Sequence, residues 1–174
     1  MKFRNLKANE IEIRVGTITE NYLTLLLYKD ARVDMNILDE TVGQMNWERE
    51  HREIKGNIYC GVSIYDKEKD DWITKWDCGS ESFTEKEKGE SSDSFKRACV
   101  NWGIGRELYT APFIYLSEKN FTSYKNAKGK IATKDKFHVE KIKIEDGTIT
   151  GLAIKNQNNK RVFMFNGGKD EDNK

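Results

Sequence analysis

The sequence predicts an α+β fold, with an antiparallel sheet packed by helices and a C-terminal β-meander after them. Two runs, 57–65 and 72–78, alternate apolar and polar residues on either side of a charged turn, which indicates neighbouring strands. Apolar residues recur every three or four positions at 30–43 and 84–102, which indicates two helices. A chain of 174 residues is long enough to bury such a core.

The first elements lie between residues 8 and 43. Residues 8–15 form a short amphipathic segment that we expect to be helical, and residues 16–28 form a hairpin that turns near Glu20. The first long helix follows, with Asp30 as its N-cap and Gly43 as the left-handed residue that ends it. Its apolar stripe comprises Met35, Leu38, Val42 and Met45.

A three-stranded antiparallel meander is predicted at 47–54, 57–65 and 72–78. One face of the second strand carries Ile58, Cys60, Val62 and Ile64, and one face of the third carries Trp72, Thr74, Trp76 and Cys78. The aromatic residues Tyr59, Tyr65 and Trp72 are open to two interpretations, packing in the core or between protomers, and stacking on bases.

The second long helix follows the meander. A capping box formed by Thr84 and Glu87 marks its start, and Gly103 marks its end. Its buried stripe comprises Lys88, Ser91, Ser92, Phe95, Ala98, Cys99 and Trp102. This stripe is predicted to pack on the sheet.

Three cations gather near the end of this helix. Arg97 is expected roughly opposite Phe95, Lys96 at the boundary between the buried and solvated faces, and Arg106 beside the helix after a tight reversal at Gly105. The glycines do not form a dinucleotide-binding loop, because they follow a helix instead of joining a strand to a helix N-terminus. An ordinary solvated face remains the alternative for these side chains.

Charge and hydropathy exclude several other classes of protein. The 30 Lys and Arg residues nearly balance the 29 Asp and Glu residues, so a polyanion would have to bind a local cluster of cations. The longest apolar run, at 22–28, is too short to span a membrane, and the charged start has no apolar signal core. We therefore expect a cytoplasmic protein.

The cysteines do not suggest a metal site. Cys60, Cys78 and Cys99 form no C-x-x-C pair, and only His51 and His138 are available to join them. Periodicity already explains these cysteines as small buried residues. We predict no metal and no other cofactor.

Three stretches, in this order and spacing, resemble the Rad-fifty-two (Rad52) family of single-strand annealing proteins, especially its phage and prophage members of the Sak type. They are "YKDARVDMNILDETVGQMNW", "GNIYCGVSIY" and "KGESSDSFKRACVNWGIGRELY", and the resemblance covers residues 8–116. It implies a β-β-β-α annealing core at 1–116, assembly into homo-oligomeric rings or helical arrays, and ATP-independent binding and annealing of single-stranded DNA in recombination or repair. It also implies that the protein acts in the cytoplasm of a bacterial or phage-infected host cell.

The resemblance also implies where DNA would bind. Arg32, Lys96 and Arg97 match basic residues that line the family's groove, and Arg14 matches another arginine before the hairpin. Arg106 is added from its charge and its place in the matching segment. The resemblance implies no catalytic residue, and by analogy a single-stranded-DNA-binding protein and an exonuclease are possible partners.

The remaining chain divides into a basic loop at 117–138, the β-meander at 139–166 and a disordered tail at 167–174. Residues 119–143 hold eight lysines against Asp135 and Glu140. The first half of this stretch has little periodicity and is expected to form a mobile loop, which either holds a second strand or a duplex or serves as a solubilising linker.

Two other functions were weighed against annealing. A metal-dependent nuclease would use the acidic residues Asp66, Asp70, Asp71, Asp77 and Glu81. The first three belong to a hairpin turn, where carboxylates commonly stay solvated, and no carboxylate pair is followed by a lysine at nuclease spacing. An oligomeric interaction protein without DNA affinity is the second alternative.

Overall fold

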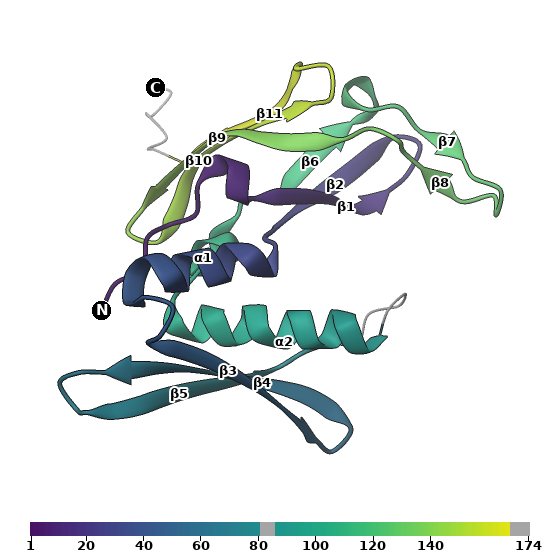
Figure 1. Ribbon diagram of the computed structural model, residues 1–174. Helices are drawn as coiled ribbons and strands as arrows, with labels where there is room; N and C mark the ends of the chain where they lie inside the picture. Colours follow the sequence, from purple (N-terminus) through teal and green to yellow (C-terminus); the bar gives the residue numbers. More distant parts are fainter. Residues whose placement is uncertain (81–85, 168–174) are drawn as a thin grey trace. The chain divides into compact units, whose positions relative to one another are not determined.

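The computed structural model describes residues 1–80 and 86–167, with side chains in the second helix from residue 89 onward. The predicted capping box at Thr84 and, apart from Gly167, the predicted tail at 167–174 therefore lie outside the described residues. The predicted α+β class is confirmed, with two α-helices and several antiparallel sheets (Figure 1). Contacts between residues divide the chain into two compact units. The first comprises residues 1–5 and 30–106, and the second comprises residues 6–29 and the chain from residue 107 onward.

The first unit joins a three-stranded sheet to both helices. Its elements are α1 (Ala31–Val42), β3 (Trp47–Ile54), β4 (Asn57–Asp66), β5 (Asp71–Cys78) and α2 (Lys86–Trp102). The strands form an antiparallel meander in the order β3-β4-β5, as predicted. Both helices lie on one side of this sheet, with α2 against the strands and α1 packed on α2 (Figure 1). Neither helix, as described, is long and apolar enough to cross a lipid bilayer.

The ends of α1 follow the sequence signals. The Asp30 carboxylate accepts a hydrogen bond from the Arg32 backbone N–H at 2.8 Å, and Gly43 ends the helix at a φ of 86°. Trp47 Nε1 then donates to the Asp39 carboxylate at 2.7 Å, which ties the helix to the start of β3. The predicted stripe was wrong at Met45, which is 87% exposed because the helix ends before it.

The core of the first unit lies between α2 and β4. Six residues of these two contacting elements are buried: Cys60, Val62 and Ile64 of β4, and Phe95, Ala98 and Cys99 of α2. The Phe95 ring stacks on Trp47 with 6.2 Å between centroids. Burial raises the pKa of the Cys60 thiol to about 11, so this cysteine stays protonated and behaves as a small apolar residue.

The opposite face of the sheet carries aromatic residues. Gly61 of β4 pairs with Trp76 of β5, so the Trp72 and Trp76 set points away from the helices. A Cβ atom at Gly61 would lie 2.6 Å from Trp76 Cε2, which means that only glycine lets the indole lie across β4. Arg52 Cζ lies 4.8 Å from the centroid of the same indole, a cation–π contact on this face.

Two cations, Arg106 and Lys75, bind backbone carbonyls at the C-terminal end of α2. Gly103 adopts a φ of 101°, and the chain then returns so that Arg106 donates to the Val100 carbonyl from Nε at 3.2 Å and from Nη2 at 2.9 Å. Arg106 Nη2 and Lys75 Nζ both donate to the Asn101 carbonyl, at 3.2 and 3.0 Å. Positive charge here is favourable because the last carbonyls of a helix carry a partial negative charge.

The described residues of the second unit form three small antiparallel sheets. Their orders are β1-β2-β6, β11-β10-β9 and β7-β8. The elements are η1 (Ala8–Glu10), β1 (Glu12–Ile18), β2 (Tyr22–Tyr28), η2 (Arg106–Thr110, whose first residue belongs to the first unit), β6 (Ile114–Ser117), η3 (Glu118–Asn120), β7 (Tyr124–Lys125), β8 (Ile131–Ala132), β9 (Phe137–Glu145), β10 (Thr148–Asn156) and β11 (Arg161–Asn166). The hairpin at 16–28 and the three strands expected after residue 138 are confirmed.

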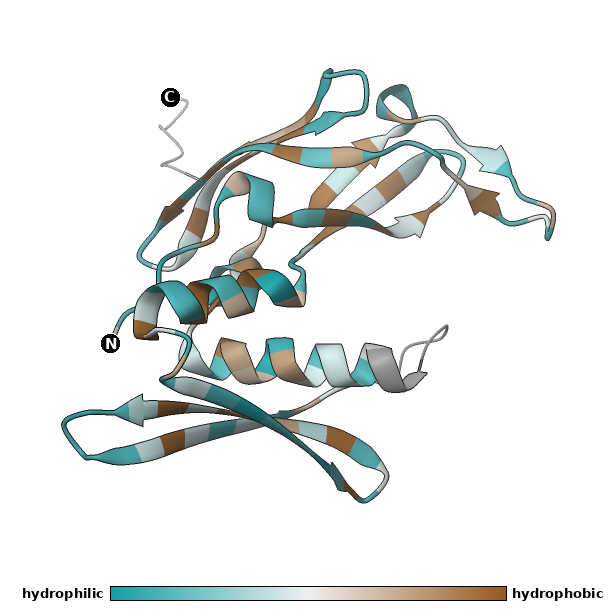
Figure 2. Ribbon diagram, viewed as in Figure 1, coloured by the Kyte–Doolittle hydropathy of each residue, from teal (hydrophilic) through white to brown (hydrophobic). Residues whose placement is uncertain are grey.

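Two local predictions in this unit were wrong. Residues 8–15 are not a helix: a single 3-10 turn ends at Glu10, and β1 starts at Glu12. Apolar Ile11, Ile13 and Val15 alternate with Glu12 and Arg14, and this period of two fits a strand. Apolar and polar colours alternate along β1 in the same way (Figure 2).

The stretch predicted as a loop at 117–138 contains η3 and the β7-β8 hairpin. The base of this hairpin is anchored by Asp135, whose carboxylate accepts from the Thr122 backbone N–H at 2.6 Å and from Gln157 Nε2 at 2.8 Å. Little periodicity is visible in the sequence because each strand has only two residues. The division of this part of the chain into separate functional segments at 117–138 and 139–166 stays a prediction.

An ion cluster links the strands of the C-terminal meander. Glu140 of β9 accepts from Arg161 of β11 at 2.7 Å and lies 3.1 Å from Lys155 of β10. The hydrogen bonds from Arg161 and then Lys155 lower the pKa of Glu140 to about 2. The carboxylate therefore stays ionised at any pH at which the protein is expected to work.

We predict that Gly61→Ala destabilises the first unit by about 1 to 3 kcal/mol, because its new methyl group displaces the Trp76 ring. Urea unfolding followed by tryptophan fluorescence measures the change. Adding Trp76→Leu should remove most of the extra cost, so the double variant should be more stable than the sum of the single changes indicates. Strict additivity would show that the two side chains do not collide.

We also predict that Arg106→Ala lowers the free energy of unfolding by about 1 kcal/mol, because carbonyls at the end of α2 lose their charged donor. Arg106→Lys should recover part of this loss, since the positive charge at the helix end remains. Urea unfolding followed by far-ultraviolet circular dichroism tests both. Equal midpoints for Arg106→Ala and the wild type would mean that these bonds contribute nothing.

Candidate nucleic-acid interface

The most direct candidate for an anion contact is the surface of α2 at Lys96 and Arg97. Phe95 fixes the rotation of the helix because its side chain is fully buried. Successive helical residues are turned by about 100°, so the next two side chains leave the buried face. Lys96 is half-buried, as its predicted boundary position requires, and the side chain of Arg97 is 44% exposed.

Arg97 also takes part in an ion pair with the sheet. Its Nε lies 3.2 Å from Asp77 Oδ1 of β5, and Asp77 accepts further hydrogen bonds from Asn101 Nδ2 at 3.2 Å and the Cys78 backbone N–H at 2.8 Å. An exposed ion pair of this kind contributes only about 0 to 1 kcal/mol. A phosphate group can therefore compete for the guanidinium at little cost.

A further cation on the α2 side of the sheet, Arg49, was missed from the sequence. Arg49 of β3 pairs with Val62 of β4, which places it on the side of the sheet that carries α2. Its guanidinium lies 4.9 Å from the centroid of the Phe95 ring. The alternation of "WEREHREI" separates Arg49 from Glu48 and Glu50, but only the strand pairing shows which set faces α2.

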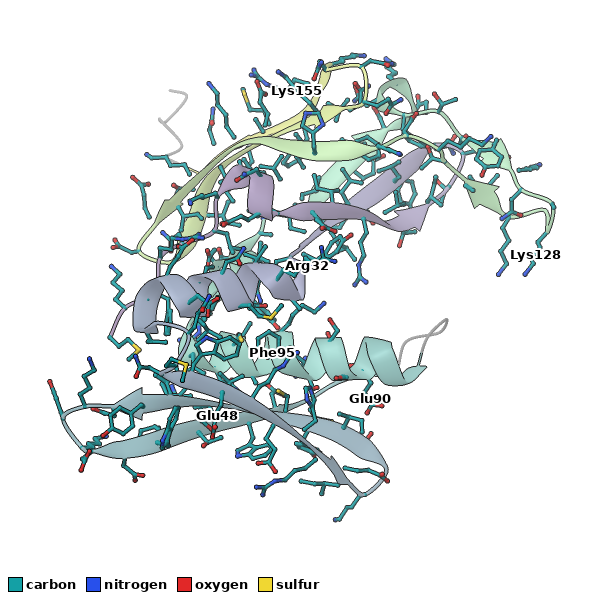
Figure 3. The ribbon with its side chains drawn as sticks, viewed as in Figure 1. Arg32, Glu48, Glu90, Phe95, Lys128 and Lys155 are labelled. Atoms are coloured by element: carbon teal, nitrogen blue, oxygen red, sulfur yellow. The ribbon has the colours of Figure 1, made fainter. Side chains whose placement is uncertain are left out.

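Arg32 belongs to the same unit and lies in the first turn of α1 (Figure 3). Its side chain is 82% exposed, and its Nε lies 3.5 Å from the Asp30 carboxylate that caps the helix. Because α1 packs on α2, the helix layer of this unit presents Arg32, Lys96 and Arg97. Exposure and a weak local pair leave the Arg32 guanidinium available to a phosphate.

The other two predicted residues differ from these. Arg106 is exposed at the end of α2, but its Nε and Nη2 bind helix carbonyls, so it has a structural role of its own. Arg14 is exposed on β1 in the second unit, with its guanidinium 6.0 Å from the centroid of Tyr28. It therefore belongs to a different unit from the cations of the helix layer.

The candidate base-stacking residues lie on the other face of the sheet. Tyr59, Tyr65 and Trp72 belong to the set that points away from α2. The rings of Tyr65 and Trp72 touch, with 5.5 Å between centroids, and the Tyr65 hydroxyl donates to Asp70, which raises the pKa of Tyr65. The sheet separates these rings from Lys96 and Arg97, so their position favours packing over stacking on a strand that follows α2.

The acidic residues considered for a nuclease are engaged in local hydrogen bonds. Asp66 accepts from the backbone N–H groups of Glu68 and Lys69 at 3.0 and 3.4 Å, and Asp71 accepts from that of Trp72 at 2.8 Å. Within residues 1–80 and 86–167, no three His, Cys, Asp or Glu side chains are grouped closely enough to hold a metal ion. Glu81 lies outside the described residues.

Comparison with known proteins identifies the family. The model of the Rad52/22 family double-strand break repair protein matches residues 3–130, a range that contains both helices, the β3-β4-β5 sheet and every predicted DNA-binding residue. No curated protein and no solved structure gives a match. Because the matched range covers well over half of the chain, the protein belongs to the Rad52/22 family of double-strand break repair proteins.

Proposed function

We propose that this protein binds single-stranded DNA and anneals complementary strands without ATP, as a phage or prophage member of the Sak type. The observation that carries the proposal is the family match across residues 3–130, because this family acts by strand annealing in repair and recombination. The cations of the helix layer, two of them exposed and one half-buried, also support it. They offer phosphate contacts that need no particular base sequence.

The proposed mechanism requires binding and release but no bond-making step. Lys96, Arg97 and Arg32 neutralise the phosphates of one strand, and Arg14, Arg49 and Arg106 are further proposed contacts. The displaced counterions supply a sequence-independent driving force. Bases that are not gripped keep their pairing edges open to a complementary strand. We therefore propose no catalytic residue and no cofactor.

We further propose that the protein acts as a homo-oligomeric ring or helical array. In the described chain, each three-stranded sheet has two outer strands that pair on one side only, and such edges can pair with another copy. An array would also line up the helix-layer cations of successive protomers along one strand of DNA. A single-stranded-DNA-binding protein and an exonuclease are proposed partners by family analogy.

We predict that Lys96→Ala and Arg97→Ala weaken binding to every single-stranded oligonucleotide and flatten its salt dependence. Each lost phosphate contact should reduce the slope of log K against log salt by about 0.7. Arg32→Ala should behave in the same way. Fluorescence anisotropy at several salt concentrations measures the slope, and a two-oligonucleotide annealing assay without ATP measures the activity.

Lys67→Ala is the matched control, because Lys67 is an exposed lysine in the turn between β4 and β5. It removes the same charge and should leave the salt slope unchanged. Folded Lys96→Ala and Arg97→Ala variants with the wild-type affinity and slope would place the groove elsewhere. Oligonucleotide cleavage that depends on added magnesium would favour the nuclease, and no binding at all would favour a DNA-independent interaction protein.

The proposed assembly predicts a mass of many subunits. Light scattering at micromolar protein should show particles several times heavier than the 20.2 kDa chain, at least when a single-stranded oligonucleotide is present. Dilution should shift the mass downwards if the contacts are reversible. A monomer mass in both the presence and the absence of DNA would contradict the ring or array.

A further inference from the structure

The β7-β8 hairpin and the residues that flank it form a strongly basic, exposed segment of the second unit. Residues 121–136 contain five lysines and one acidic residue, Asp135. All five lysines, at positions 125, 128, 130, 134 and 136, are exposed. Both oxygens of Asp135 are occupied by Thr122 and Gln157, and its hydrogen bonds hold the base of the hairpin. The acid therefore does little to neutralise the lysines near the tip, where Lys128 lies (Figure 3).

The turn of this hairpin is built in the same way as the turn between β10 and β11. The Asn126 side chain accepts from the backbone N–H groups of residues 128 and 130 at 2.9 and 3.0 Å, and Asn156 accepts from those of 158 and 160 at 3.0 and 3.1 Å. Each asparagine also donates its backbone N–H to a lysine carbonyl four residues later, at 2.9 Å in both turns. Gly129 and Asn159 both adopt positive φ, at 71° and 59°.

The two turns differ mainly in their charge. "NAKGK" of the first corresponds to "NQNNK" of the second, so Lys128 stands where the other turn has Asn158. The second turn shows that this backbone forms without a lysine at that position. The local fold therefore does not require Lys128, and clustering like charges on a small hairpin costs stability through repulsion. A ligand with repeated negative charges is the natural counterpart.

An aromatic ring accompanies these lysines. The Tyr124 side chain is 42% exposed, and its cross-strand neighbour is Ala132, which is too small to cover the ring. Lys134 Nζ lies 5.5 Å from the ring centroid. An exposed ring beside several cations is the combination that binds single strands, since the ring stacks on an unpaired base while the cations contact phosphates.

We propose that the β7-β8 hairpin is a second nucleic-acid contact, in which Lys125, Lys128 and Lys130 bind the phosphate backbone and Tyr124 stacks on an unpaired base. This inference rests on the proposed function, since it assumes that the protein binds DNA. Lys125 lies 3.6 Å from Glu20, an exposed pair that a phosphate can replace. The hairpin belongs to the second unit, whereas Lys96 and Arg97 belong to the first.

The test uses the full chain and fluorescein-labelled oligonucleotides, single-stranded and duplex, over a range of salt concentrations. Lys128→Asn with Lys130→Gln should reduce the single-strand salt slope by about 1.4, which is two contacts at about 0.7 each. Tyr124→Leu should weaken single-strand binding by about tenfold and leave duplex binding unchanged. Thermal melts establish whether each variant is folded. We expect Lys128→Asn to fold, because the "NQNNK" turn has an asparagine at the equivalent position.

Lys160→Gln is the matched control, because Lys160 occupies in the second turn the place that Lys130 occupies in the first. It should leave affinity and slope at their wild-type values. Hairpin variants that keep the wild-type slope while Lys96→Ala and Arg97→Ala lose theirs would overturn this inference alone. A wild-type protein that binds no oligonucleotide would overturn the proposed function and this inference together. Equal losses on duplex, with no effect of Tyr124→Leu, would overturn the assignment to a single strand.

Discussion

The packing of α2 on β4 is the constraint on which the rest of the first unit depends. Phe95, Ala98 and Cys99 are buried together with Cys60, Val62 and Ile64, and a helix held by such a set cannot rotate without exposing part of it. The direction of Lys96 and Arg97 is thus fixed by apolar residues that carry no charge themselves. A site of this kind is preorganised, because the cost of ordering the helix is met by the core and not by the ligand.

Acidic residues determine which cations remain available for a phosphate. The chain is nearly neutral, yet many of its carboxylates are used in specific local contacts: Asp135 anchors a hairpin, Glu140 links three strands, and Asp30 caps a helix. Each carboxylate held in this way neutralises its surroundings and little beyond them, because salt screens longer distances. A net charge of +1 is therefore compatible with strongly basic local surfaces.

Much of this fold could be predicted from the sequence because its signals are local. Asp30 and Gly43 bound a helix by capping and φ preference, and alternation identified the strands of both meanders. Strand pairing is not local, so the sequence did not show that the Trp76 set and the Cys60 set occupy opposite faces. Arg49 was missed for the same reason, since only its pairing with Val62 shows which face it joins. The prediction of a helix at residues 8–15 was wrong because so short an amphipathic run fits the period of a helix as well as that of a strand.

The two matching turns of the second unit separate what folding needs from what it does not. Both use an asparagine side chain to bind two backbone N–H groups and a residue at positive φ to complete the reversal. These shared features account for the backbone, and they are met equally well by "NAKGK" and "NQNNK". The positive charge at Lys128 is left without a structural explanation within its turn. Comparing two segments of one chain thus isolates a side chain whose presence points to an external partner, and repeated phosphates fit the surrounding lysines.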